Sequence, residues 1–217
     1  NASADMQARI LVSNPEPRRA SDVMFDTERY PRFRWGLGPY VATGLFDPDN
    51  PVRADFGARL SFNYDVAPGL FLSGSVTKKL IGNLDQSKRL SNSVLPRVRS
   101  DGVLYDKQGD PSIERLTLAW NAHPSSEVYT RVTAGYLEPM FAGLSAEVLW
   151  KRVDSPFALG VEVNYVKKRD YDRLFGLRDY SVVTGHLSGY YAFGNGFNAQ
   201  VDVGRYLAGD VGATLTL

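Results

Sequence analysis

The sequence contains no cysteine among its 217 residues. Disulfide bonds, zinc–thiolate sites and thiol catalysis are therefore excluded, although the compartment stays open because many envelope proteins also lack disulfides. No run of about 18 apolar residues occurs, so the sequence predicts no transmembrane helix. With two histidines and no cysteine, neither a metal site nor a cofactor is expected.

An excess of either charge is also missing, since 25 basic residues face 24 acidic ones and the formal net charge is +1. A general attraction to nucleic acid or to anionic lipid is therefore not expected. Glycine (20), tyrosine (12) and phenylalanine (11) are plentiful, which favours sheets joined by tight turns over helices.

The stretch Val52–Val66 alternates apolar and polar residues without a break. Successive side chains of a strand point to opposite faces, so one face would be wholly apolar and the other would carry Arg53, Asp55, Arg59 and Asp65. At about 3.3 Å per residue, such a strand reaches roughly 50 Å, far beyond the usual soluble strand. This pattern favours a barrel wall between lipid and a wet lumen.

The rest of the chain predicts one irregular segment followed by strands. Residues 1–31 are expected to be irregular, and residues 32–217 to form the barrel, with more chain on both sides in the native protein. Ten strands are expected at about 32–43, 52–66, 70–80, 112–122, 127–138, 143–153, 157–167, 179–193, 197–207 and 211–217.

The expected connections alternate between two kinds. Tight turns are predicted at 67–69, 123–126, 154–156 and 194–196, and loops at 44–51, 81–111, 139–142, 168–178 and 208–210. Bacterial outer-membrane barrels show this asymmetry, with short periplasmic turns and longer extracellular loops. The alternative, a soluble sandwich with an aromatic core, would leave aromatic and charged residues unsorted by depth.

Side chains on the apolar face are sorted by depth. An aromatic girdle at the membrane interface is predicted near the tight turns, formed by Trp35, Tyr64, Trp120, Trp150, Phe157, Phe193 and Phe197. Charged residues expected on the same face lie near the long loops, where a lipid-facing charge costs least: Lys78, Glu114, Glu138, Lys167 and Arg205.

The opposite face is expected to line a lumen with charged residues: Arg53, Asp55, Arg59, Arg115, Arg131, Glu147, Lys151, Glu162 and Asp202. Two interpretations stay open, a ladder of opposite charges that stiffens the wall and a polar path along which a hydrated glycan slides, with the arginines favouring acidic sugars. Loop 168–178 is predicted at the barrel mouth, where Arg169, Tyr171, Arg173 and Phe175 would contact glycan or pair within the loop.

One arrangement resembles a catalytic dyad, His186-Leu187-Ser188. Outer-membrane phospholipases use His-x-Ser, but here the pattern turns His186 and Ser188 inward, away from lipid. No catalytic residues are therefore predicted.

Several phrases of the sequence resemble one family, and they are found at 95–101, 135–143, 168–172, 175–180, 183–187, 203–210 and 212–215. In this order they are similar to the carboxy-terminal barrel region of the YjbH family, an outer-membrane component encoded with exopolysaccharide and group 4 capsule genes. The resemblance implies a role in secreting or assembling an extracellular polysaccharide, with periplasmic and outer-membrane partners. Family members are often lipoproteins, but the lipidated cysteine is missing from this sequence.

The sequence thus predicts an antiparallel up-and-down transmembrane β-barrel in the bacterial outer membrane, either closed by about ten strands or part of a larger barrel. Ten closed strands would be narrow and plugged, whereas about sixteen leave an aqueous channel. A non-enzymatic part in polysaccharide secretion is expected. A lipid-modifying barrel enzyme and a purely structural barrel or adhesin remain alternatives.

Overall fold

The computed structural model describes residues 32–46, 50–88, 90, 92–93, 96, 98–194 and 196–217. The chain divides into two units, Asn1–Pro31 and Arg32–Leu217, and the second unit carries everything that follows. The irregular segment expected at 1–31 lies outside the described residues.

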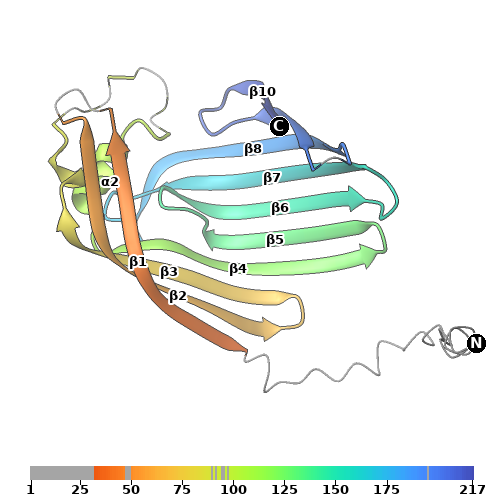
Figure 1. Cartoon of the computed structure of the whole chain (residues 1–217), viewed down its shortest axis with the longest axis horizontal. Coiled ribbons are helices and arrows are strands. Elements are labelled where there is room, and N and C mark those ends of the chain that lie inside the picture. Colours follow the sequence, from red (N-terminus) through yellow and green to blue (C-terminus); the bar gives the residue numbers. More distant parts are fainter. Residues whose placement is uncertain are drawn as a thin grey trace, which may run out of the picture. The chain divides into compact units, whose positions relative to one another are not determined.

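The described part is a ten-stranded antiparallel sheet in which each strand pairs with its neighbours in the sequence (Figure 1). The strands are β1 (Phe33–Leu45), β2 (Val52–Ala67), β3 (Leu70–Gly82), β4 (Ser112–Ser125), β5 (Val128–Tyr136), β6 (Phe141–Lys151), β7 (Phe157–Arg169), β8 (Leu177–Ala192), β9 (Asn198–Arg205) and β10 (Val211–Thr216). The all-β, up-and-down arrangement predicted from the sequence is confirmed.

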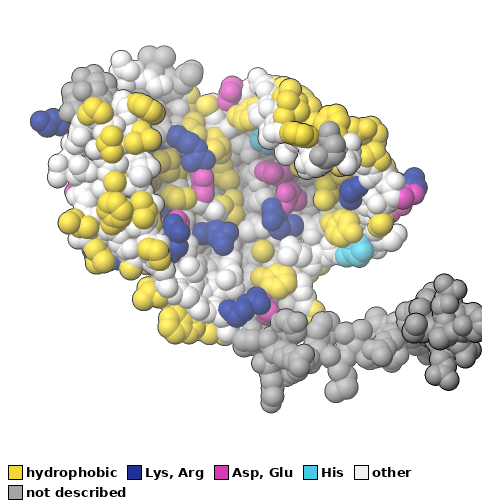
Figure 2. Space-filling view, in the orientation of Figure 1, with side chains coloured by type: hydrophobic (Ala, Val, Ile, Leu, Met, Phe, Trp, Pro, Cys, Tyr) yellow, Lys and Arg dark blue, Asp and Glu magenta, His cyan; other side chains and the backbone are white. Residues whose placement is uncertain are grey.

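The sheet has two unequal faces because its long strands keep the alternation of the sequence. On β2, Arg53 and Asp55 are buried, whereas Val52, Phe56 and Leu60 are exposed on the other side. We call the side of Arg53 and Asp55 the inner face and the side of Phe56 and Leu60 the outer face. Lys, Arg, Asp and Glu side chains gather in the hollow formed by the inner face (Figure 2).

The outer face exposes large apolar side chains along its whole width. Leu37 is 69% exposed, Val163 52% and Leu187 59%, and β2, β3, β4 and β6 carry comparable residues on the same face, whereas the large apolar residues of β5 on this face are only half-buried. Soluble monomers rarely expose contiguous apolar patches larger than a few hundred Å². The outer face therefore needs an apolar partner.

The sheet curls, and β1–β3 run at a steep angle to β5–β8 (Figure 1). Among the described strands, β1 pairs with β2 alone and β10 with β9 alone, so the sheet ends at two edges. Closure of the barrel thus stays a prediction.

The described residues of loop 83–111 are partly helical, and several of them contact the inner face. It contains the 3-10 turn η2 (Leu84–Gln86) and the helix α2 (Gly102–Gln108), where the sequence predicted only a long loop. No helix in the described residues is long and apolar enough to cross a membrane.

A buried hydrophobic cluster also belongs to the inner face, at the end of the sheet that carries the long loops. Phe141, Val166 and Val182 come from three adjacent strands and are buried. Around them pack Val98 from the loop, Leu137, Met140, Tyr180 and Leu207. The hollow is therefore filled at this end.

Candidate functional site: the polar inner face and its filled end

A row of polar residues crosses the middle of the inner face. Arg131, Glu147, Glu162 and His186 lie directly opposite one another on β5, β6, β7 and β8. Arg131 Nη2 lies 2.5 Å from Glu147 Oε2, whereas Glu162 accepts a hydrogen bond from Asn164 and forms no ion pair among the described residues. Like charges directly opposite each other destabilise a sheet, so Glu147 and Glu162 oppose the stability of this wall.

The predicted His-x-Ser pair points inward but does not form a dyad. Ser188 Oγ donates a hydrogen bond of 2.5 Å to Asp202 Oδ1, and Gln200 Nε2 donates to the same carboxylate. The His186 ring instead meets the ring of Tyr206 edge-on at 4.8 Å. A serine hydroxyl that donates to a carboxylate, with its histidine turned elsewhere, is not activated by that histidine.

Two cavities open along this part of the inner face. The first, of 510 Å³, is lined by polar, aromatic and small residues: Asn121, Tyr129, Arg131, Glu147, Leu149, Ala158, Gly160, Glu162, Ser188 and Tyr190 among them. The second, of 560 Å³, shares Ala158 and Tyr190 with the first and includes Lys151 and Gln200. Together they extend the hollow from mid-strand toward the tight turns.

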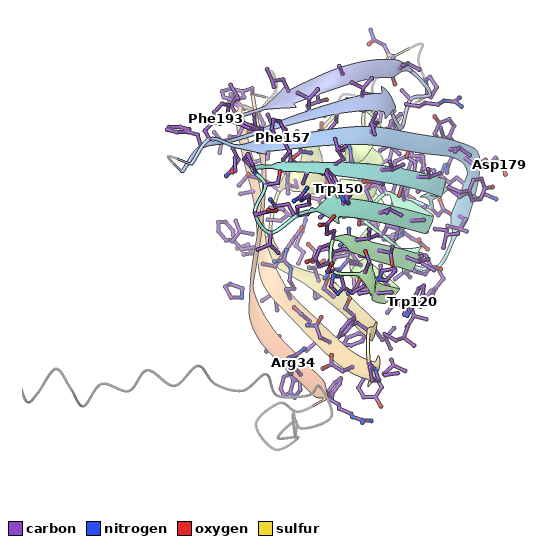
Figure 3. The ribbon with its side chains drawn as sticks, turned by 90° about the vertical axis from the view of Figure 1, so that its right-hand side faces the viewer. Arg34, Trp120, Trp150, Phe157, Asp179 and Phe193 are labelled. Carbon is purple, nitrogen blue, oxygen red and sulfur yellow. The ribbon has the colours of Figure 1, made fainter. Side chains whose placement is uncertain are left out.

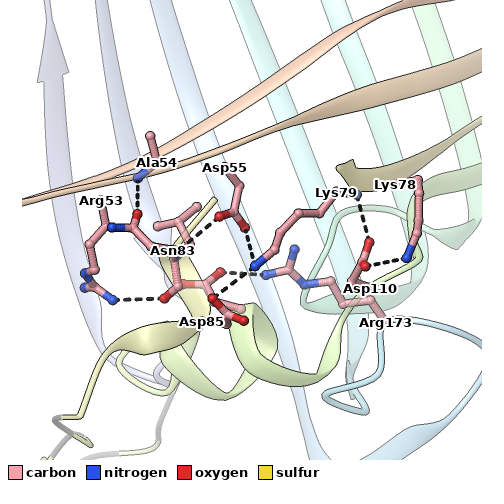
Figure 4. A network of polar contacts seen from close by, with 11 residues as sticks. Arg53, Ala54, Asp55, Lys78, Lys79, Asn83, Asp85, Asp110 and Arg173 are labelled. Atoms are coloured by element: carbon pink, nitrogen blue, oxygen red, sulfur yellow. Dashed lines mark hydrogen bonds and ion pairs between the residues drawn. The ribbon is translucent and has the colours of Figure 1, made fainter. Parts of the chain in front are cut away.

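At the other end, η2 is bound to β2 through both of the predicted lumen residues there (Figure 4). Arg53 Nη1 donates to the carbonyl oxygen of Leu84 at 3.0 Å, and Asp55 Oδ1 accepts from the Leu84 backbone N–H at 3.0 Å. Asn83 Oδ1 accepts from the backbone N–H of Ala54. Arg53 and Asp55 thus hold the filling loop and do not line either of the two cavities above.

Further ion pairs join the loop to strands on both sides of the hollow (Figure 4). Lys79 Nζ lies 3.0 Å from Asp85 and 3.6 Å from Asp55. Arg173, in the turn after β7, donates to Asp106 of α2 at 3.2 Å. Burial raises the pKa of the Asp106 carboxyl, while the Arg173 guanidinium lowers it. These contacts join η2 to β3 and α2 to the turn after β7.

The most deeply buried ion pair joins the loop to β7. Lys168 Nζ donates to both oxygens of Asp101 at 2.8 and 2.7 Å, and the two side chains are 5% and 3% exposed. Beside them Tyr105 of α2 donates to the Arg169 carbonyl at 2.6 Å and meets the ring of Tyr171 edge-on. Burial and the nearby Asp101 carboxylate raise the pKa of the Tyr105 hydroxyl. We call the described residues of 83–110, with these contacts, the plug.

Arg169 was predicted in the mouth loop, and this placement is wrong. It is the last residue of β7 and is fully buried. Its guanidinium donates to the carbonyls of Glu138, Arg173 and Leu174, so it closes the turn after β7 from inside. The fork of donors in arginine suits this role because one side chain satisfies several carbonyls.

The other mouth-loop residues lie in the turn at 170–176 and contact protein. Tyr171 donates to Asp101, and the guanidinium of Arg178 lies over its ring at 4.2 Å. Phe175 is exposed and meets the ring of Tyr136 edge-on. Of the two interpretations of this loop, pairing with neighbouring residues matches these contacts.

Among the remaining predicted lumen charges, Arg59 bonds to Glu114 at 2.7 Å. Glu114 was expected on the outer face, but a bulge at Ser75–Val76 turns its carboxylate to Arg59 and to Ser75 Oγ. The prediction failed because a bulge adds one residue and breaks the two-residue period. Arg115 pairs with Ser75 in the ladder and lines a cavity of 390 Å³ with Arg59.

The predicted aromatic girdle residues are all exposed: Trp35, Tyr64, Trp120, Trp150, Phe157, Phe193 and Phe197. Trp120, Trp150, Phe157 and Phe193 lie near the ends of their strands that carry the tight turns (Figure 3). Trp150 Nε1 donates to Glu127 in the adjacent turn, so the polar edge of this ring points toward the strand end. Their contact with lipid stays a prediction.

Sequence reasoning missed the partners supplied by the plug. Asp101, Tyr105 and Asp106 lie in a segment without a strand pattern, so nothing indicated that they would be buried. One signal was present, since Asp101 closes a phrase used for the family resemblance. In the described residues, no cluster of His, Asp or Glu has the arrangement of a metal site.

These features define a class of protein: an antiparallel up-and-down sheet with an apolar outer face and a charged inner face that is filled at one end. The chain belongs to the YjbH family, whose model, described as "Exopolysaccharide biosynthesis protein YbjH", matches residues 2–217. The family resemblance noted in the sequence is thus confirmed.

A curated relative is the Escherichia coli (strain K12) protein named "Uncharacterized lipoprotein YjbH". It is 34% identical over 194 residues, which cover 86% of this chain and 28% of the relative. The chain therefore spans little more than a quarter of that protein. No solved structure matches the chain.

Proposed function

We propose that this chain forms part of the wall of a β-barrel in the bacterial outer membrane. The barrel takes part in the secretion or assembly of an exopolysaccharide or capsule and does not catalyse a reaction. The observation that carries the membrane part is the outer face, where nine of the ten strands expose large apolar side chains. Backbone groups in lipid must be satisfied internally, and an up-and-down sheet that closes does so. The polysaccharide part rests on the family.

The two ends of the sheet suggest its orientation. Tight turns and the exposed girdle aromatics would lie at the periplasmic interface, and the plug with the longer loops at the cell exterior. The partners would be outer-membrane lipid, the polysaccharide, and periplasmic and outer-membrane proteins of the same secretion system.

The first experiment tests the membrane location. The full-length protein should fractionate with the outer membrane, require detergent and migrate differently on gels before and after heating. A protein that stays monomeric and soluble without detergent would overturn the barrel proposal.

The second experiment separates polysaccharide secretion from a purely structural or adhesive barrel. Deletion of the gene should reduce surface polysaccharide, and the wild-type gene should restore it. Unchanged polysaccharide in the deletion strain would favour a structural barrel.

A third experiment addresses lipid-modifying activity, to which the contacts of Ser188 and His186 give no support. Phospholipase and acyltransferase assays should give the same background for the wild type and for His186→Ala. Activity that disappears in His186→Ala would contradict the non-enzymatic proposal.

A further inference from the structure

The 510 Å³ cavity on the inner face combines the three kinds of group that bind sugars: aromatic rings, a small-residue floor and hydrogen-bonding side chains. Tyr129 and Tyr190 supply the rings, and Ala158 and Gly160 the floor. Tyr190 also lines the neighbouring 560 Å³ cavity, so it stands where the two meet. A ligand longer than one sugar unit could therefore pass along its ring.

The floor beneath Tyr190 is shaped by Gly160. A Cβ atom at Gly160 would lie 3.4 Å from Tyr190 Cε2 and 3.6 Å from the Cβ of Ser188. These are ordinary van der Waals distances, so the Tyr190 ring lies directly beside the small-residue floor at Gly160. At the rim, the rings of His123 and Tyr129 stack with centroids 4.5 Å apart, which fixes the second aromatic surface.

The charge of the cavity wall is negative. Its described lining contains Arg131, Glu147 and Glu162, and Arg131 is paired with Glu147. Glu162 therefore contributes a carboxylate that no cation balances among the described residues. It also lies opposite Glu147, an arrangement that lowers the stability of the sheet. Local rules are broken in this way chiefly at functional sites.

Basic side chains of the inner face are engaged elsewhere. Lys79, Lys168 and Arg173 form ion pairs with aspartates of the plug. Lys151, at the edge of the second cavity, donates to the carbonyl of Ser155. Lys151 keeps its positive charge there, so the uncompensated negative charge that an acidic sugar would meet lies in the first cavity, at Glu162. This reverses the preference for acidic sugars that the arginines alone suggested.

We propose that the cavity binds a glycan segment that carries free amino groups, with a sugar ring on Tyr190 and an ammonium group at Glu162. The inference rests on the proposed function, to which it adds the chemical class of the polysaccharide. Ser188 and Asn121 lie in the same lining and supply hydrogen bonds to hydroxyl groups.

The experiment is calorimetric titration of the full-length protein in detergent at about pH 6, where carboxylates are ionised and amines protonated. Three probes of equal length are compared: a glucosamine tetramer, its N-acetylated counterpart and a galacturonate tetramer. The glucosamine tetramer should bind about fivefold more tightly than the acetylated one, as expected for a partly exposed ion pair, and galacturonate least.

Variants assign the preference to the cavity. Glu162→Gln should make the glucosamine tetramer and its N-acetylated counterpart bind equally. Asp154→Asn, which removes a charge in an exposed turn, should leave the preference for the glucosamine tetramer unchanged. Tyr190→Leu should weaken both probes by about fivefold and Tyr190→Phe should not, because the ring is kept. Heat modifiability on gels identifies variants that have folded.

Equal binding of all three probes, tighter binding of galacturonate, or an unchanged preference in Glu162→Gln would overturn the inference. These outcomes are separable from failure of the proposed function. If deletion of the gene reduces surface polysaccharide but no preference is measured, the assignment of the sugar class alone is wrong. If the preference is measured on a protein that needs no detergent, the site stands and the barrel proposal falls.

Discussion

The plug depends most heavily on the buried pair of Lys168 and Asp101, and Lys168→Met tests this dependence. The substitution keeps most of the side-chain volume but removes both charged hydrogen bonds to the Asp101 carboxylate, at 2.8 and 2.7 Å. The remaining partner from β7–β8 is the hydroxyl of Tyr171 at 3.3 Å. A carboxylate that is 3% exposed would thus lose its cation.

Removal of one partner from a buried ion pair costs about 3–5 kcal/mol, because an uncompensated charge stays in the interior. Most of this cost should fall on the docking of the plug, because Asp101 can regain water if α2 leaves the inner face. A loss of about 3 kcal/mol corresponds to roughly 150-fold faster opening-limited hydrogen exchange of the α2 amides.

The assay is hydrogen–deuterium exchange of the full-length protein in detergent, with peptides from α2 compared with peptides from β7. The double variant Asp101→Leu/Lys168→Met serves as the control, since replacement of both charges by apolar groups is often neutral. Exchange of α2 in Lys168→Met within about threefold of wild type would refute the reasoning. Equal acceleration in the single and double variants would refute it as well.

Two further predictions concern the sheet and its acid stability. Gly143→Val should prevent folding and abolish the heat-modifiable gel band, because a Cβ atom at Gly143 would lie 2.0 Å from the Tyr165 carbonyl oxygen. Gly189→Val is the control and should fold, because the space around Gly189 is open. Burial alone would raise the pKa of Asp110, but hydrogen bonds from Lys78 and a backbone N–H lower it. A carboxyl whose pKa is lowered in the folded state stabilises the fold above its unfolded-state pKa, and this stabilisation is lost as pH falls through the folded-state pKa. Asp110→Asn should therefore reduce stability at neutral pH and flatten the decline in stability below about pH 4. Denaturant unfolding at several pH values measures both effects.

Strands were predictable because a half-apolar wall forces a two-residue period. Val52–Val66 was predicted as one strand and observed as β2, Val52–Ala67. Turn residues defined the strand ends well at Pro68-Gly69, where Gly69 adopts a positive φ of 77°. Where a bulge adds a residue, as at Glu114, the period is broken and the predicted face was wrong.

The plug was not predictable from local patterns. Its helix is seven residues long and is held by partners distant in sequence, such as Asp101 with Lys168 and Tyr105 with Arg169. Short helices are stabilised by tertiary packing more than by their own propensity, so periodicity carries little signal for them. The same contacts explain why Arg169 was placed in an exposed loop although its side chain is buried.

Within the candidate site, the sequence identified the right side chains but not their partners. Arg131, Glu147 and Glu162 were predicted inward and lie side by side on the inner face. The division into an acidic, aromatic half and a plugged half, where basic side chains pair with aspartates, required the structure because it depends on which residues the plug covers.

A pair of adjacent substitutions in β7 tests whether the outer face contacts lipid. Val163 is exposed on the outer face at mid-strand, and Asn164 points inward to Glu162 and Thr184. The measurement is the amount of heat-modifiable protein in the outer membrane for Val163→Arg and Asn164→Arg. If the outer face contacts lipid, we expect a large loss for Val163→Arg, since an arginine facing mid-membrane lipid costs about 2–4 kcal/mol, and near wild-type levels for Asn164→Arg. Equal levels for both variants, as on a water-exposed surface, would contradict it.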